Sequence, residues 1–242
     1  MNEGAGPADF EIEPLGETML LLRFGERVDA AVNARVHAAA HMLSRVELPG
    51  LVDVIPAYAT LALHYDAPFW AGRDGSPPWQ HLAGALRAVF AGVQRSEPHE
   101  GRSVEIPVRY GGEHGADLEA VAAHAGLDID AVIARHVAVE YRVAMLGFAP
   151  GFPYLLGLDP ALRMPRRAQP RTRVPRGSVA IGGAQTGIYP SELPAGWQLI
   201  GRTPLTLFDA AREPPCLLAP GDRVRFRAID AAEFDALAES AR

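Results

Sequence analysis

The sequence of 242 residues contains no lysine, so all 23 of its basic residues are arginines. A lysine-free chain cannot form a Schiff base or build a phosphate loop of the P-loop type. Its one cysteine, Cys216, excludes an internal disulfide and a zinc site made of several thiolates. The G-x-S-x-G and H-E-x-x-H signatures are also missing. These absences argue against a stand-alone ATPase or zinc hydrolase.

Long apolar runs and excess positive charge are lacking as well. The longest apolar stretches, such as residues 17–24, are strand-sized and far short of the roughly 20 residues that cross a bilayer. The formal net charge of -6 argues against general nucleic-acid binding. No charged and apolar leader is recognisable, so we expect a cytoplasmic protein without membrane or nucleic-acid partners.

Glycine and proline are plentiful, at 24 and 21 residues, which indicates many turns. In the first hundred residues we expect strands at 10–13 and 18–24 and a pair of strands within 51–65. Helical spacing of apolar residues predicts helices over 29–47, with Asp29 as the N-cap, and over 78–94. This order predicts an α+β domain over residues 1–100, with helices on one face of an antiparallel sheet. The polar segment 95–103 is the expected linker.

The remainder of the chain has a different pattern. We expect a strand at 104–110, two short helices near 117–125 and 128–138, and a final helix from about residue 230. Between them, short β-like runs alternate with glycine and proline turns. These runs cover residues 141–146, 178–181, 187–189, 197–200, 205–208 and 224–229. Such spacing predicts a mainly-β domain, a barrel or a sandwich, over residues 101–242.

Six arginines and no acidic residue lie between Pro160 and Ser191, namely Arg163, Arg166, Arg167, Arg171, Arg173 and Arg176. A guanidinium is a rigid donor fork that matches carboxylate or phosphate. The cluster is therefore either a solvated surface or an anion site, and Arg202 at a later turn could add a contact.

Two further features leave alternatives open. His136 ends a predicted helix, where it could serve as a general acid or base or could simply complement the helix C-terminus. The glycine-rich stretch 181–190 could be a plain turn or could cradle an anion with its amides. The pair His37 and His41, four residues apart among alanines, is better explained by structure than by metal binding.

Aromatic residues are concentrated in the loop 147–155. Phe148, Phe152 and Tyr154 stand between glycines and prolines, which would present rigid rings at low entropic cost. Such rings suit a ring-shaped ligand or a partner surface, or they plug the end of a barrel.

The runs 147–155, 165–190 and 197–209 resemble those of the B-subunit family of 5-oxoprolinase, also described as KipI-like or allophanate hydrolase subunit 1. The stretch 109–122 and the spacing from His136 through Tyr141 fit the same family. The chain departs from it in having Ala195 where glycine is common, and in carrying Arg176, whose role we leave unassigned. The resemblance implies a small α/β N-terminal domain and a cyclophilin-like barrel.

The resemblance also implies a function. The expected activity is ATP-dependent opening of 5-oxoproline (pyroglutamate) to glutamate, together with a homologous C subunit, and with a separate A subunit. We hypothesise that ATP activates the lactam by phosphorylating the amide oxygen. Because Mg²⁺ prefers carboxylate ligands, which are absent from residues 160–191, we expect no metal site there and place most of the ATP–Mg site on partner subunits.

The candidate residues follow from this reading. We expect His136 to transfer a proton and Arg173 to be catalytic. The expected substrate-binding residues are Tyr141, Phe148, Phe152, Arg166, Arg171, Gln185, Thr186, Tyr189, Trp197 and Arg202.

Two alternative functions remain at this point. One is a KipI-like inhibitor of a sensor histidine kinase, in which the aromatic loop and the arginines form a protein-binding surface. The other is a subunit of an allophanate or urea-carboxylase-type enzyme. The sequence favours the oxoprolinase because the family motifs lie in one stretch suited to a ligand pocket.

Overall fold

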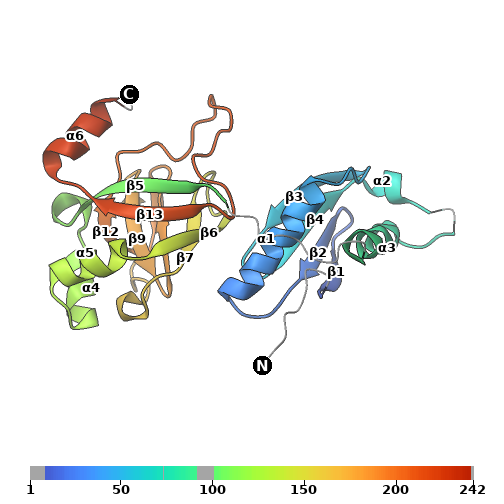
Figure 1. The fold of residues 1–242 in the computed structure, drawn as a ribbon, viewed down its shortest axis with the longest axis horizontal. Helices are drawn as coiled ribbons and strands as arrows, with labels where there is room; N and C mark the ends of the chain where they lie inside the picture. The colour runs from blue at the N-terminus through green and yellow to red at the C-terminus, as the bar shows by residue number, and fades with distance from the viewer. Residues whose placement is uncertain (1–8, 73, 92–100, 241–242) are drawn as a thin grey trace. The chain divides into compact units, whose positions relative to one another are not determined.

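The computed structural model describes residues 9–72, 74–91 and 101–240 (Figure 1). The chain divides into two compact units, residues 1–100 and 101–242. Most of the linker predicted at 95–103 lies outside the described residues. No described helix is both long enough and apolar enough to cross a bilayer.

The first unit is built on a four-stranded antiparallel sheet of order β1-β2-β4-β3. Its strands are β1 (Glu11–Leu15), β2 (Met19–Arg23), β3 (Leu51–Pro56) and β4 (Thr60–Tyr65). Buried and half-buried residues alternate along β2 and β4, so leucines such as Leu22 and Leu63 point into one core. That core also takes residues from the helices α1 (Ala30–Ser44) and α3 (Pro78–Ala91). The predicted mixture of sheet and helices is confirmed.

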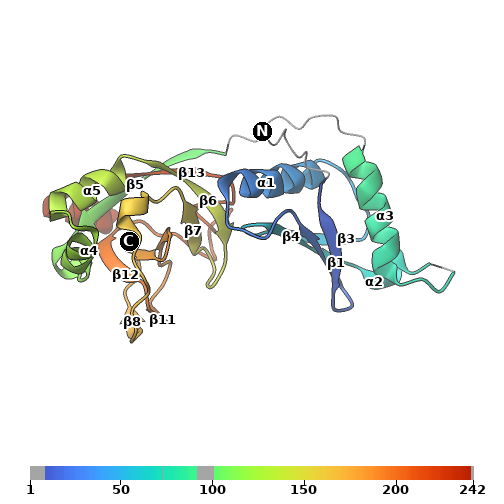
Figure 2. The ribbon, with the colours of Figure 1, turned by 90° about the horizontal axis from the view of Figure 1, so that it is seen from below.

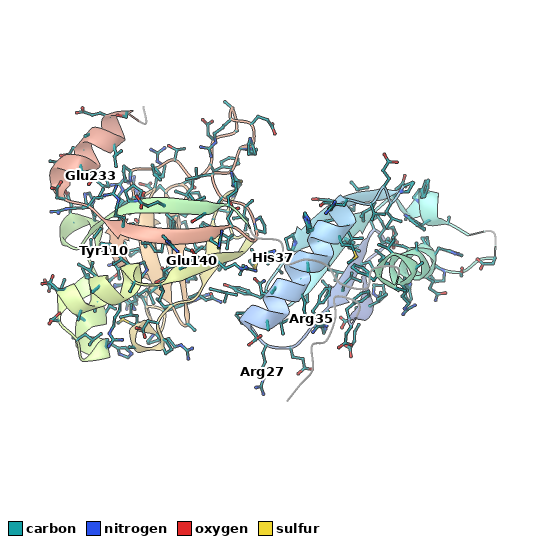
Figure 3. All side chains as sticks on the ribbon, in the orientation of Figure 1. Arg27, Arg35, His37, Tyr110, Glu140 and Glu233 are labelled. Carbon is teal, nitrogen blue, oxygen red and sulfur yellow. The ribbon has the colours of Figure 1, made fainter. Side chains whose placement is uncertain are left out.

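Local sequence signals explain the helix ends in this unit. The carboxylate of Asp29 accepts hydrogen bonds from the amides of Ala31 and Val32, so Asp29 is the N-cap that the sequence predicts. A short helix, α2 (Ala67–Trp70), precedes α3 and was not expected from periodicity. His37 is buried on α1 (Figure 3) and its Nε2 lies 3.0 Å from Oδ1 of Asn33, in keeping with a structural role.

The second unit contains a closed seven-stranded barrel of order β10-β7-β6-β13-β5-β12-β9. The strands are β5 (Ser103–Tyr110), β6 (Glu140–Leu146), β7 (Pro153–Leu156), β9 (Ser178–Gly182), β10 (Gln185–Ile188), β12 (Gln198–Arg202) and β13 (Arg223–Ala228). All neighbours are antiparallel except β5 and β13, which are parallel. The predicted barrel is confirmed, whereas its likeness to cyclophilin stays a prediction.

Helices accompany the barrel. Two of them, α4 (Leu118–Ala125) and α5 (Ile129–Val137), occupy the positions that the sequence predicts, and α6 (Ala231–Ser240) follows β13. Two single turns of 3₁₀ helix, Gly112–His114 and Pro160–Leu162, lie in the connections. Residues from α4 and α5, such as Val121 and Val132, join the barrel core.

One predicted strand is wrong, and three observed strands were missed. Residues 205–208 form no strand and contribute only an isolated bridge between Phe208 and Cys216. Pro204 precedes this segment, Pro214 and Pro215 lie in the facing segment that ends at Cys216, and prolines cannot donate to a β ladder. The missed strands are β7, β8 (Arg171–Val174) and β11 (Leu193–Ala195), all of them short.

Strands β8 and β11 pair with each other and form an arm that projects from the barrel (Figure 2). The chain returns from the arm to β9 through Gly177, where a Cβ atom would lie 2.2 Å from the carbonyl oxygen of Thr203. Because its φ is also +81°, only glycine suits this turn. The arm carries part of the pocket that follows.

Candidate functional site

The barrel unit contains a pocket of about 200 Å³ whose walls are mainly aromatic and arginine side chains. It collects residues from the loop before β7, from β7, from the arginine-rich segment, from the residues after β10 and from the arm. The lining consists of Phe148, Phe152, Tyr154, Arg166, Arg167, Pro170, Tyr189, Pro194, Ala195, Gly196 and Trp197. Five of these eleven belong to the expected substrate-binding residues.

The aromatic walls are fixed by contacts among the rings. Phe152 is 1 % exposed and meets four rings edge-on: that of Phe148, and those of Tyr154 at 4.9 Å, Tyr189 at 5.1 Å and Trp197 at 5.7 Å between centroids. Edge-to-face pairs at these distances are favourable beyond the area that they bury. The pocket is therefore held open by a packed aromatic cluster rather than by mobile side chains.

Glycines make room for these rings. A Cβ atom at Gly182 would lie 2.5 Å from the indole ring of Trp197, and one at Gly187 would lie 2.9 Å from Phe152. The glycine-rich stretch 181–190 thus forms the β9–β10 hairpin against which the pocket wall packs. This geometry favours the structural alternative for that stretch.

Phe148 stands at the edge of the pocket in a strained conformation. Its φ is +66°, the one left-handed value among non-glycine residues in the described part of the chain. Its side chain is 62 % exposed and its ring lies 5.5 Å from that of Phe152. Strain of this kind costs about 1–3 kcal/mol and is concentrated at functional sites. An exposed aromatic ring held at such a cost points to a contact made with a ligand or a partner.

Arg166 supplies the positive charge of the pocket. Its guanidinium carbon lies 5.7 Å from the centroid of the Trp197 ring, a cation–π contact. Within residues 9–72, 74–91 and 101–240, no carboxylate forms an ion pair with it. Its donor fork is therefore available to an anion in the pocket.

Two phenols complete the polar part of the lining. Burial raises the pKa of Tyr189 to about 12. Burial also raises the pKa of Tyr154, although the charge of Arg166 acts in the opposite direction. Both hydroxyls are accordingly protonated near neutral pH and can donate a hydrogen bond.

A buried carboxylate neutralises part of the arginine cluster. Asp117 accepts two hydrogen bonds from Arg171, at 2.8 and 2.9 Å, and one from Arg167 at 2.9 Å. Burial by itself would raise the pKa of Asp117, but these bonds, the amide of Leu199 and the arginine charges hold the pKa below its usual value. Arg171 therefore faces Asp117 rather than the pocket.

The other arginines separate. Arg173 lies on the arm, 76 % exposed, and pairs with Glu192. Arg202 ends β12, the strand that begins beside Trp197, and its Nε donates to the carbonyl oxygen of Arg176 at 2.7 Å. Neither Arg173 nor Arg202 lines the pocket. The predicted cluster is thus brought together only in part.

His136 lies inside the barrel unit, fully buried, and not in the pocket lining. The hydroxyl of Thr186 donates to the carbonyl oxygen of Ala180, so it accepts from Nε2–H of His136 at 3.2 Å. Nδ1 of His136 then accepts from the hydroxyl of Tyr110 at 2.8 Å. Tyr110, at the end of β5, is labelled in Figure 3. Burial lowers the pKa of His136 to about 3. A neutral imidazole with both nitrogens satisfied favours a structural role, while its role in proton transfer stays a prediction.

Three further expected residues lie near His136 or the hairpin. Tyr141 is fully buried and donates to the carbonyl oxygen of His136 at 2.9 Å. Thr186 is buried in the bond network just described. Gln185 is half-buried at the start of β10, opposite Gly182. The structure does not bring these three into the pocket.

Sequence reasoning missed Asp117 and Arg167 as site residues. Asp117 precedes a predicted helix and so resembles an ordinary N-cap. Arg167 was seen only as one of six arginines, and nothing in the spacing distinguishes its position from that of Arg163. A signal was present in the lack of acids near the cluster, because buried arginines need a carboxylate from elsewhere in the chain.

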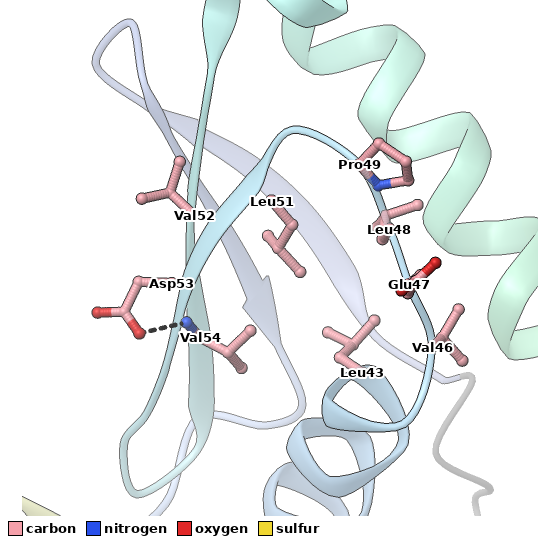
Figure 4. A pocket seen from close by; sticks show the side chains of 9 residues that line it. All are labelled: Leu43, Val46, Glu47, Leu48, Pro49, Leu51, Val52, Asp53 and Val54. Carbon is pink, nitrogen blue, oxygen red and sulfur yellow. Dashed lines mark hydrogen bonds between the residues drawn. The ribbon is translucent and has the colours of Figure 1, made fainter.

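A second, broader cavity of about 510 Å³ lies in the first unit beside β3 (Figure 4). Its described lining is largely aliphatic, with Leu43 and Leu51 among it, and its charged members are Glu47 and Asp53. Asp53 accepts a hydrogen bond from the amide of Val54 at 2.8 Å. An anionic ligand would be repelled there, so the barrel pocket is the better candidate. Among the described residues, no three His, Cys, Asp or Glu side chains gather as a metal site would require.

Comparison with known proteins identifies the family of the chain. Residues 10–218 match the family model of the carboxyltransferase domain, subdomains C and D. The chain is 42 % identical to the B subunit of 5-oxoprolinase from Bacillus subtilis, over 95 % of this chain and 97 % of that protein. The chain belongs to the B-subunit family of 5-oxoprolinase. A protein of the same name from Escherichia coli O157:H7 is 46 % identical over 88 % of this chain and 93 % of that protein.

Two solved structures match most or all of the chain. A conserved uncharacterized protein from Pyrococcus horikoshii is 42 % identical, with a TM-score of 0.55 over 93 % of this chain and 100 % of that chain. The K. lactis urea amidolyase matches with a TM-score of 0.74 over 100 % of this chain, which spans 16 % of that chain. At 20 % identity, the second match shows a shared fold alone.

Proposed function

We propose that this chain is the B subunit of an ATP-dependent 5-oxoprolinase, which opens 5-oxoproline to glutamate together with partner subunits. The observation that carries the proposal is the Arg166–Trp197 pocket, in a chain whose relatives are named for this reaction. The partners we propose are a homologous C subunit, which would pair with this chain, and a separate A subunit. The complex would act in the cytoplasm.

The pocket suits the chemistry of 5-oxoproline. This molecule is a five-membered lactam ring with one carboxylate. The carboxylate would bind the guanidinium of Arg166, and the ring would lie against the aromatic walls of Phe152 and Trp197. A protonated phenol, from Tyr154 or Tyr189, could donate to the lactam carbonyl and polarise it.

The same pocket does not fit a complete nucleotide. Its volume of about 200 Å³ is below the range of about 300–1,000 Å³ that is usual for larger ligands. Its lining offers guanidiniums and phenols, whereas Mg²⁺ prefers carboxylate oxygens. We therefore propose that ATP and Mg²⁺ are held largely by the partner subunits and that this chain contributes the lactam site.

Catalytic roles for His136 and Arg173 stay predictions. His136 is enclosed by Tyr110 and Thr186, and Arg173 faces solvent from the arm. Replacing either residue with alanine supports its predicted role if turnover falls greatly while the subunits still assemble. Loss of assembly in the same variants would assign the residue to structure.

The experiment is a reconstitution. This chain is purified with and without the two partner subunits, and ATP hydrolysis and glutamate release are measured with and without 5-oxoproline. We expect ATP hydrolysis that depends on 5-oxoproline, and glutamate release, from the complete set alone. Turnover of allophanate instead would favour the urea-carboxylase alternative. Tight binding of a sensor histidine kinase without any turnover would favour the inhibitor alternative.

A further inference from the structure

Asp117 makes four hydrogen bonds from a position that is 5 % exposed. Arg171 binds both of its oxygens, Arg167 binds Oδ1, and the backbone amide of Leu199 donates to Oδ2 at 2.7 Å. A carboxylate with this set of donors is fully satisfied and fixed in orientation. It therefore acts as a rigid anchor rather than as a free acid.

The partners of Asp117 belong to three separate segments that build the pocket. Arg167 lines the pocket from the segment before the arm, and Arg171 opens β8 at the base of the arm. Leu199 lies on β12, two residues after Trp197. One carboxylate thus fixes the segment of Arg166 relative to β12, the strand that follows Trp197.

The backbone around Asp117 is shaped for this task. Asp117 occupies the N-cap position of α4, yet its side chain makes no capping hydrogen bond. An aspartate at an N-cap ordinarily accepts a hydrogen bond from a backbone amide in the first turn of its helix. Asp117 lacks this capping bond, which would otherwise stabilise α4. The approach also depends on Gly115, where a Cβ atom would lie 2.3 Å from the carbonyl oxygen of Ile200.

We infer that Asp117 is a positioning residue that sets the charge selectivity of the pocket. By engaging Arg167 and Arg171, it leaves Arg166 as the cation presented to a ligand, and the site favours small ring acids with a single negative charge. Without the carboxylate, two more guanidiniums would become available, and the affinity of the pocket for dianions would rise. The identity of the ligand rests on the proposed function, whereas the charge of the site follows from the contacts of Asp117.

The first test compares two ligands on the full chain. 5-Oxoproline has one carboxylate, and glutarate has two on a five-carbon chain. In Asp117→Asn we expect the affinity ratio to shift toward glutarate by about tenfold, the factor that one charge-assisted hydrogen bond is worth. An equal loss of affinity for both ligands would assign Asp117 to structure alone and overturn the inference.

The second test needs no ligand and decides the inference even if the wild-type chain binds neither acid. Trp70 and Trp79 are replaced with phenylalanine, so that Trp197 is the one tryptophan left to fluoresce. Quenching by iodide, an anion, is compared with quenching by neutral acrylamide. In Asp117→Asn we expect the iodide constant to rise about twofold, because positive charge is unmasked near the ring, with the acrylamide constant unchanged. An equal rise of both, or no change in either, would contradict the inference.

Matched variants separate charge from folding. Asp222 is another buried aspartate, bound by Arg102 and by the amide of Ala219, and it lies outside the pocket lining. Asp222→Asn should lower stability without changing the iodide constant or the ligand ratio. Should Asp117→Asn fail to fold, Arg167→Gln leaves Asp117 with Arg171 and Leu199. Because Asp117 already masks Arg167, the iodide constant should fall much less in Arg167→Gln than in Arg166→Gln, and an equal fall in both would overturn the inference.

Discussion

The indole ring of Trp197 packs directly on the bare backbone of Gly182, where even a methyl group would come within 2.5 Å of it. The pocket wall and the β9–β10 hairpin are therefore a single packed unit. This contact explains why glycine stands at a point where the backbone needs no positive φ. It also makes Gly182 a backbone position on which the shape of the pocket depends.

Gly182→Ala should displace Trp197 and weaken binding of 5-oxoproline. Overpacking of a tight contact costs typically about 1–3 kcal/mol, so the free energy of unfolding should fall by that amount. Tryptophan emission and urea unfolding measure the two effects. Gly183→Ala is the control. Gly183 lies in the same hairpin and has a positive φ, but a Cβ atom added there would have no other atom within 4 Å. Trp197 emission should stay unchanged in the control, and an equal shift in both variants would speak against the packing argument.

Tyr189→Phe should reduce affinity for 5-oxoproline by about tenfold, the typical loss when one hydrogen bond to a bound group disappears. Because burial raises the pKa of Tyr189 to about 12, the hydroxyl stays protonated and affinity should not change between pH 7 and 9. Calorimetric titration measures both effects.

Tyr65→Phe is the control for that variant. The Tyr65 hydroxyl donates to the carbonyl oxygen of Glu17 in the first unit, so its loss should leave affinity unchanged. Affinity that falls as pH rises toward 9 would show that a phenol ionises in the pocket and would contradict the prediction.

His136 should make the stability of the barrel unit depend on pH. Its pKa is about 3 when folded and about 6.5 when unfolded, so the unfolded state binds more protons between those values. Stability should therefore be fully present above pH 6.5 and decline as pH falls, by at most about 1.4 kcal/mol per pH unit from this group. Urea unfolding at pH 5, 6 and 7 measures the slope.

His136→Gln removes the titrating group. The slope should become flatter by at most about 1.4 kcal/mol per pH unit, the contribution of one proton. Arg45→Gln, on an exposed residue of the first unit, should leave the slope as in the wild type. Identical slopes in the wild type and in His136→Gln would mean that the imidazole titrates normally, and hence that it is not enclosed as the structure shows.

The sequence predicts most of the barrel because its strands are short apolar runs separated by glycine and proline turns. It fails where pairing depends on distant partners. β8 and β11 are rich in arginine and proline and exist only because they pair with each other. The run at 205–208 looks like a strand by composition, but the prolines around it leave too few donors for a ladder.

The candidate site is predicted in part for a similar reason. Aromatic residues such as Phe152 and Trp197 converge because large rings bury together, and that tendency is visible in the sequence. The partition of the arginines is not visible, since it depends on Asp117, about fifty residues away in the chain. The spacing of His136 likewise says nothing about whether its ring points to a pocket or into the core.

The most direct test of the lactam site is the turnover of 5-oxoproline by the reconstituted complex that contains Arg166→Gln. We expect kcat/KM to fall at least about tenfold, because a charge-assisted hydrogen bond to the substrate carboxylate is removed. Arg163→Gln, on a neighbouring exposed arginine outside the pocket lining, should retain wild-type turnover. A fully assembled Arg166→Gln complex with kcat/KM within about twofold of the wild type, a difference well under 1 kcal/mol, would contradict a lactam site at Arg166.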